Sequence, residues 1–339
     1  MKKLLLCLAS VLFSPFYLFS QDTFSIVAVD SVSGEIGSAG ASCIGIILPI
    51  APHGAQIISD VIPGKGAIHT QAQYDGLNQQ SARTRMLAGD SPQQIIAWLK
   101  ANDAWGDSSV RQYGIVDFNA GHPRSSGFTG SGCMNYKKHV LGKNYAIQGN
   151  ILLGQKILDS IESRFLNSNG TLADKLMEAL QGANIVGADT RCSSHNTSSL
   201  SSFIRVAKPT DTIDKYSLDL YMSYENNVVG NIKVDPIDSL QTLYNIWKSS
   251  NGIAEFESSK LKVKLFYDDE MNPIFEFEKF EQNENYRVSI IDLFGKNILT
   301  ENINQKKFSP SVSGFAKGIY FYQLSNNSQM FSIGKLFLK

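Results

Sequence analysis

A threonine near the start of the chain is the residue whose type and position best fit nucleophilic chemistry. Thr23 opens a β-rich segment, residues 23–30 (TFSIVAVD), directly after an apolar leader. A Thr, Ser or Cys at a chain terminus can attack a carbonyl carbon while its own α-amino group takes the proton, because the pKa of that amine is about 7.7–8.0. A strand that begins at the terminus holds both groups rigidly. We therefore predict that Thr23 is a nucleophile.

Other catalytic signatures are missing from the sequence. It contains no G-x-S-x-G elbow, no P-loop and no H-E-x-x-H motif. The five histidines are not spaced as metal ligands usually are, so we expect no metal site and no cofactor. Cys133 is a conceivable nucleophile, but no neighbour in the sequence activates its thiol, and packing or disulfide formation is the better interpretation.

The first twenty residues predict a secretory signal peptide. Lys2 and Lys3 form a basic start, residues 4–19 are mostly apolar, and Ser20 supplies a small residue at the cleavage point. Pro15 interrupts the apolar stretch, which favours a signal peptide over a membrane anchor. The rest of the chain has no apolar run of about 20 residues, so we predict no transmembrane anchor.

Length and charge limit the classes of function. The chain has 339 residues, 43% hydrophobic and 18% charged, which suits about two globular domains. Its 31 basic residues equal its 31 acidic ones, and loss of the leader removes two lysines. Without a basic surplus, nucleic acid is excluded as a partner. Any two of the remaining cysteines can pair in an oxidising compartment, namely Cys43, Cys133 and Cys192.

Residues 21–250 mix strand and helix patterns and form the first predicted domain. The strands are expected at 23–30, 35–41, 64–73, 113–118, 145–149, 199–206 and 218–224. The helices are expected after the capping residue Ser91, over 154–165, after the capping residue Thr171, and from Asp235 to Trp247. Strand groups around a central helical stretch indicate an α+β fold with helices covering sheets.

The helical period disappears after residue 250. Residues 251–260 (NGIAEFESSK) are polar and predict a linker, and residues 261–339 contain six short strands separated by turn residues. This pattern is typical of a small β-sandwich. From the residues alone, such a domain either binds carbohydrate or packs on the preceding domain.

Three segments of the C-terminal domain carry a resemblance. They are residues 288–296 (VSIIDLFGK), 318–322 (GIYFY) and 335–339 (KLFLK). In this order and position they resemble the type A C-terminal sorting domain of type IX secretion substrates from Bacteroidetes, although the usual Tyr-Pro-Asn-Pro opening is absent. The resemblance implies recognition by the type IX secretion machinery, passage through periplasm and outer membrane, and a secreted or cell-surface protein. Such domains are often removed after export.

Residues 23–248 resemble a second family. Among the carrying segments are 23–28 (TFSIVA), 66–72 (GAIHTQA), 111–117 (RQYGIVD) and 145–152 (YAIQGNIL). They are similar to the domain-of-unknown-function family 1028, which is placed in the N-terminal-nucleophile (Ntn) hydrolase superfamily. The resemblance implies a four-layer αββα sandwich, and by analogy hydrolysis of an amide by a terminal hydroxyl.

The same resemblance implies roles for three further residues. Asp189 and Arg191 match the family's Gly-Asp-x-Arg segment, and such a pair can orient a polar substrate group or the terminal amine. Asn150 follows Gln-Gly and either donates a hydrogen bond to an oxyanion or caps the following helix. We predict a site of Thr23, Asn150, Asp189 and Arg191.

Two functions follow from these observations. The first is a secreted hydrolase that cleaves an amide bond in a small amide, a peptide or a cell-wall fragment. The second is a surface protein that binds a peptide or glycan without turnover. The second is motivated by Gln21 and Asp22, which precede Thr23 if the leader is cut after Ser20, and by residues 192–195 (CSSH), where the family has Gly-x-Gln-Ser.

Overall fold

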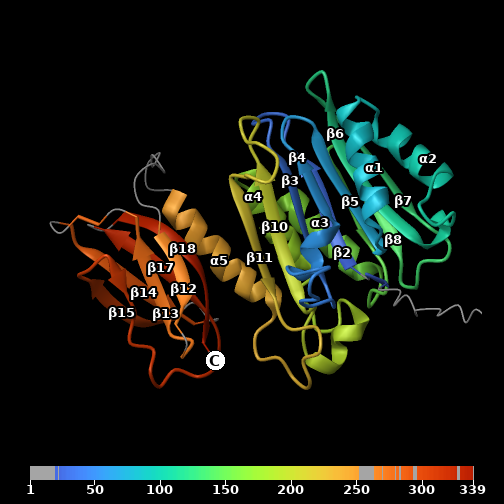
Figure 1. Cartoon of the computed structure of the whole chain (residues 1–339). Helices are drawn as coiled ribbons and strands as arrows, with labels where there is room; N and C mark the ends of the chain where they lie inside the picture. Colours follow the sequence, from blue (N-terminus) through green and yellow to red (C-terminus); the bar gives the residue numbers. More distant parts are fainter. Residues whose placement is uncertain are drawn as a thin grey trace, which may run out of the picture.

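A computed structural model of the chain describes residues 20–21, 23–251, 263–268, 270–278, 280–281, 284–292, 296–326 and 329–338 (Figure 1). The predicted signal peptide lies outside the described residues apart from Ser20. The predicted linker, residues 251–260, lies outside them apart from its first residue. None of the helices among the described residues has the length and apolar character needed to cross a membrane.

The first sheet of the N-terminal domain is antiparallel and has the strand order β1-β5-β6-β7, with β4 also paired to β5. Its strands are β1 (Ser20–Gln21), β4 (Ser59–Ile62), β5 (Gly66–Gln73), β6 (Arg111–Asn119) and β7 (His122–Thr129). Helices α1 (Gly76–Leu87) and α2 (Pro92–Ala101) cover one face (Figure 1). The predicted capping box at the start of α2 is confirmed, because Ser91 and Gln94 bond each other's backbone N–H groups.

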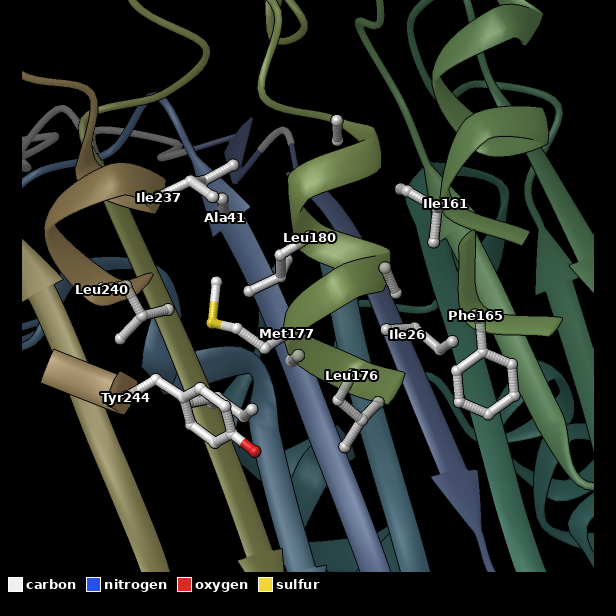
Figure 2. Packing of buried hydrophobic residues seen from close by; sticks show 14 of the residues in the cluster. Ile26, Ala41, Ile161, Phe165, Leu176, Met177, Leu180, Ile237, Leu240 and Tyr244 are labelled. Atoms are coloured by element: carbon white, nitrogen blue, oxygen red, sulfur yellow. The ribbon is translucent and has the colours of Figure 1, made fainter. Parts of the chain in front are cut away.

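The second sheet is antiparallel and has the order β11-β10-β3-β2-β9-β8. Its strands are β2 (Thr23–Val29), β3 (Ile36–Ser42), β8 (Lys138–Leu141), β9 (Tyr145–Gly149), β10 (Ser201–Ala207) and β11 (Leu218–Ser223). The outer face is covered by α3 (Gln155–Asn167), α4 (Leu172–Gly182) and α5 (Pro236–Asn251). Figure 2 shows Leu176, Met177 and Leu180 of α4 packed over the sheet, with Leu240 and Tyr244 of α5 beside them.

The two sheets face each other, so the domain has four layers: helices, sheet, sheet, helices (Figure 1). Strand β2 lies against β5 and β6 of the opposite sheet. One half of the space between the sheets is filled by an apolar cluster that includes Val27, Val29, Val61 and Val116. The predicted α+β fold with an αββα sandwich is confirmed.

Three short 3-10 helices complete the domain: η1 (Gly54–Ile58), η2 (Ser108–Val110) and η3 (Thr190–His195). Five strands and α-helices of the domain had no counterpart in the sequence prediction, namely β1, β4, β7, β8 and α1.

The C-terminal region consists of two antiparallel sheets around one core, in agreement with the predicted small β-sandwich. The sheets contain β12 (Val263–Tyr267), β13 (Pro273–Phe277) and β16 (Lys307–Phe308), and β14 (Tyr286–Ile291), β15 (Asn297–Ile303), β17 (Gly318–Asn326) and β18 (Gln329–Leu338). This region packs on α5, because Ile291 and Phe321 belong to the same buried cluster as Leu243 and Tyr244 (Figure 1).

Candidate functional site

The space between the sheets is polar at one end. Alternate residues of β2 point toward the opposite sheet, and along the strand they change from Thr23 and Ser25 to Val27 and Val29. The intervening residues Phe24, Ile26 and Ala28 belong to the cluster beneath the helices. One face of β2 is therefore apolar along its whole length. The other face is polar at the start of the strand and apolar toward its end.

Thr23 lies at the first position of β2 and is fully buried. Its carbonyl oxygen accepts hydrogen bonds from the backbone N–H of Asn150 (3.2 Å) and from Nε2 of Gln71 (3.2 Å). Across the sheet, Thr23 is paired in register with Ser42 of β3. The start of β2 is thus held by hydrogen bonds from the opposite sheet as well as by pairing within its own sheet.

Two glutamines join Thr23 to Asn150. Gln112 donates through Nε2 to the carbonyl oxygens of Gly149 (2.9 Å) and Lys138 (3.2 Å), which fixes the orientation of its amide. Its Oε1 must then accept, from Gln71 Nε2 (2.7 Å) and from Asn150 Nδ2 (3.1 Å). Asn150 is fully buried, and within the described part of the chain its Oδ1 has no hydrogen-bond partner.

This geometry decides between the two readings of Asn150. The residue does not cap the following helix, because α3 begins at Gln155 and its N-cap is Gly154. The amide instead points into the polar end between the sheets, where one hydrogen of Nδ2 is used by Gln112. The role of Asn150 as an oxyanion donor stays a prediction.

Two of the six non-glycine residues with left-handed backbone among the described residues lie beside the same site. Ile151, which follows Asn150, has a φ of 53°, and Ala72, which follows Gln71, has a φ of 67°. Left-handed backbone is uncommon for any residue with a Cβ and is a genuine outlier for a β-branched one. Such conformations persist where the surrounding structure imposes them, and they cluster at functional sites.

Asp189 and Arg191 form a bidentate ion pair next to Ser42. Arg191 donates from Nη2 to Oδ2 of Asp189 (2.7 Å) and from Nε to Oδ1 (3.0 Å). Asp189 is fully buried, whereas the Arg191 side chain is 32% exposed. Nη2 of Arg191 also lies 3.5 Å from Oγ of Ser42, the register partner of Thr23. The four residues predicted from the sequence are therefore brought together at one end of the sandwich.

A disulfide fixes the ion pair to the sheet. Cys43 and Cys192 are joined over 149 residues of sequence, which resolves the pairing that the sequence left open. The N–H of Cys43 donates to Oδ2 of Asp189 (2.8 Å). Cys133 lies apart from this bridge, with its Sγ 3.3 Å from the carbonyl oxygen of Arg111.

A second polar chain, absent from the sequence prediction, continues from Gln71 toward the middle of the sandwich. Oγ of Ser25 donates to Gln71 Oε1 (2.5 Å) and accepts from Gln148 Nε2 (2.6 Å). Nδ1 of His69 lies 3.0 Å from Gln148 Nε2 and 2.9 Å from Ser25 Oγ, and Nε2 of His69 lies 2.6 Å from Ser38 Oγ. Burial, with a smaller contribution from the charge of Arg205, lowers the pKa of His69 to about 3.

These features define the chemistry that the site can perform. A hydroxyl, an aligned primary amide and an anchored guanidinium can attack, stabilise and orient a polar substrate group. The described residues contain no cluster of three or more His, Cys, Asp or Glu side chains suited to a metal ion.

Comparisons with known proteins agree with the fold of both regions. Residues 23–235 match the family of unknown function DUF1028, and residues 272–339 match the secretion system C-terminal sorting domain. The solved structure of protein SPO2555 from Silicibacter pomeroyi, a DUF1028 protein, is 21% identical, with a TM-score of 0.51 over 68% of this chain and 91% of that one. Domains 3 and 4 of rat CD4 also align, at 10% identity over 70% and 82% of the chains, but with a TM-score of 0.18. No curated protein matches the sequence.

The two family matches cover different parts of the chain and indicate different things about it. The C-terminal match indicates export by the type IX secretion system, to the cell surface or beyond it. The N-terminal match begins at Thr23, the residue that heads β2, and extends almost to the start of α5. The chain therefore belongs to the DUF1028 family and carries a C-terminal sorting domain for secretion.

Proposed function

We propose that the mature protein is an exported amidohydrolase of the Ntn type, with Thr23 as its terminal nucleophile. The observation that carries the proposal is the position of Thr23 at the head of a central strand, between the sheets, where Asn150 N–H binds its carbonyl oxygen and the Asp189–Arg191 pair lies beside Ser42, its register partner. The family match that begins at the same residue supports it. Removal of the residues before Thr23 supplies the α-amino group that the mechanism needs.

The proposed reaction has two steps. Oγ of Thr23 attacks the amide carbonyl, the α-amine takes the hydroxyl proton, and the proton passes to the leaving nitrogen as the C–N bond breaks. Water then attacks the resulting ester, the amine again takes a proton, and the acid leaves while Thr23 recovers its hydroxyl. In this scheme Asn150 donates to the oxyanion, and Arg191, held by Asp189, orients a carbonyl or carboxylate of the substrate.

A β-lactone tests the nucleophile without knowledge of the substrate. Attack by Oγ opens the lactone ring and keeps all its atoms, so the intact mass of a chain that begins at Thr23 should increase by the mass of one lactone. We expect Thr23→Ser to react and Thr23→Ala to lose the adduct, with Thr84→Ala on α1 as an exposed control. An adduct that persists in Thr23→Ala, or that maps to another residue, would refute the assignment.

The complete burial of Thr23 favours a second candidate, a surface protein that binds a peptide or glycan without turnover. In the chain that retains Ser20 and Gln21, these residues form a strand beside the site and Thr23 is not exposed to solvent. The N-terminal sequence of the exported protein separates the two functions. A chain that begins at Thr23 supports the hydrolase, and one that begins at Gln21 and binds its ligand without cleavage supports the binding protein.

A further inference from the structure

The strand β5 has an edge that, among the described residues, only Ser20 and Gln21 cover; they belong to the leader in the wider sense of the whole chain before Thr23. On one side β5 pairs with β6 along most of its length. On the other side β4 pairs with β5 from Gly66 to His69, and β1 pairs beyond it, with Ser20 opposite Gln73 and Gln21 opposite Ala72. On this side of β5, no other strand of the described residues pairs with its last part. Removal of the chain before Thr23 therefore leaves the edge at Ala72 and Gln73 open.

This edge leads directly to the proposed nucleophile. Gln21 opposes Ala72, and one residue separates Gln21 from Thr23. The neighbour of Ala72, Gln71, donates to the Thr23 carbonyl oxygen (3.2 Å). An extended chain on the edge of β5 therefore ends at Thr23, as the leader does. Unpaired N–H and C=O groups of a strand edge are the groups that bind an extended peptide as an added strand.

The edge is held rigidly by a buried ion pair. Nη1 of Arg111 donates to the carbonyl oxygen of Gln73 (2.6 Å), and Nε of Arg111 donates to Asp103 (2.7 Å). Both charged side chains are 1% exposed, and the guanidinium lies 4.5 Å from the ring centre of Trp105. Because the end of β5 is already ordered, a bound peptide would not have to order it, which lowers the cost of binding.

We propose that the mature protein binds its substrate as an extended peptide, whose acyl side pairs with β5 at Ala72 and Gln73 in the place that Ser20 and Gln21 occupy here. The proposal rests on the proposed function, and it names peptides as the substrate class over glycans and small amides. It also assigns a role to the leader, which blocks the same edge until it is removed.

The test uses the leader sequence itself as a probe. A fluorescent peptide with the sequence of residues 18–22 (LFSQD), amidated at its end, is titrated into the full chain beginning at Thr23, and its anisotropy is followed. We expect saturable binding that Thr84→Ala, on the exposed side of α1, leaves unchanged. N-methylation of the peptide at its Ser or its Gln should weaken binding at one of the two positions by about tenfold, because only one of two successive N–H groups faces β5.

A matched protein control is the chain that begins at Ser20. Its tethered leader competes for the edge at an effective concentration on the order of millimolar, so the peptide should bind it at least about tenfold more weakly. Equal binding to both chains, insensitivity to N-methylation at both positions, or no saturable binding at millimolar peptide would overturn the proposal. Peptide binding without β-lactone acylation would refute the hydrolase alone, and acylation without peptide binding would refute the strand site alone.

Discussion

His69 lies between the two sheets with its ring fully buried, and acid should destabilise the N-terminal domain through this residue. In the unfolded chain the pKa of His69 has its ordinary value of 6.5, whereas burial lowers it to about 3 in the folded protein. Between these values the unfolded chain binds a proton that the folded chain does not bind. The contribution of the neutral ring to stability is therefore complete above pH 6.5 and is lost as the pH falls toward 3.

The size of the effect follows from the two pKa values. One pKa unit corresponds to about 1.4 kcal/mol, so the free energy of unfolding should fall by about 1.4 kcal/mol for each pH unit below 6.5. At pH 4 the loss is about 3.5 kcal/mol, a large part of the 5–15 kcal/mol that is roughly typical of a domain. Below pH 3 both states carry the proton, and this contribution becomes constant.

Urea denaturation followed by tryptophan fluorescence measures the loss. All three tryptophans of the chain precede residue 251, so the signal reports the N-terminal domain. We expect His69→Gln to be less stable than the wild type at pH 7 but to have a pH slope shallower by about 1.4 kcal/mol per unit between pH 6 and 4. His122→Gln, which changes an exposed histidine, should keep the wild-type slope. Parallel slopes for wild type and His69→Gln would refute the reasoning.

Three further predictions concern stability. Asp103→Asn should lower the free energy of unfolding, measured by urea denaturation, by about 3–5 kcal/mol because it leaves Arg111 buried without its charged partner. Glu178→Gln removes an ion pair in which both side chains are 50% exposed, so it should lower the free energy of unfolding by under about 1 kcal/mol. Replacing both Cys43 and Cys192 by Ser should cost about 2–5 kcal/mol, and a reductant should lower the Tm of the wild type but not of this variant. Ala72→Gly should be neutral or stabilising by calorimetry, because relief of the left-handed backbone offsets the roughly 1 kcal/mol that glycine costs in a regular strand.

The parts of the fold that the sequence predicted are those with strong local signals. The alternating pattern of 23–30 and the caps at Ser91 and Thr171 each identified an element that the structure contains. Helix α1 was not predicted because it buries only three residues, one of them Asn78, and so lacks an apolar stripe. Strand β7 was not predicted because Pro and Gly interrupt its sequence and none of its residues is buried.

The candidate site was predictable in part for a similar reason. Thr23 stands out by its place in the chain, and the family resemblance supplied Asn150, Asp189 and Arg191. Gln71 and Gln112 gave no such signal, because their partners are far away in the sequence and the hydrogen bonds depend on how two sheets stack. The sequence does contain one signal for these two glutamines: within their strands, polar residues alternate with apolar ones, and the neighbouring segments are otherwise apolar.

The buried polar side chains between the sheets determine how Thr23 is held, and therefore from which side it can react. Buried amides and hydroxyls stabilise a fold only when their hydrogen bonds are made, and here the chain from Ser38 through His69, Ser25 and Gln71 ends on the carbonyl oxygen of Thr23. The carbonyl is thereby held from within the protein, while the side that the leader covers is the side from which the proposed peptide substrate would arrive. Removal of the leader would then expose the amine and hydroxyl of Thr23 without loosening the strand that positions them, since none of these hydrogen bonds involves a residue before Thr23.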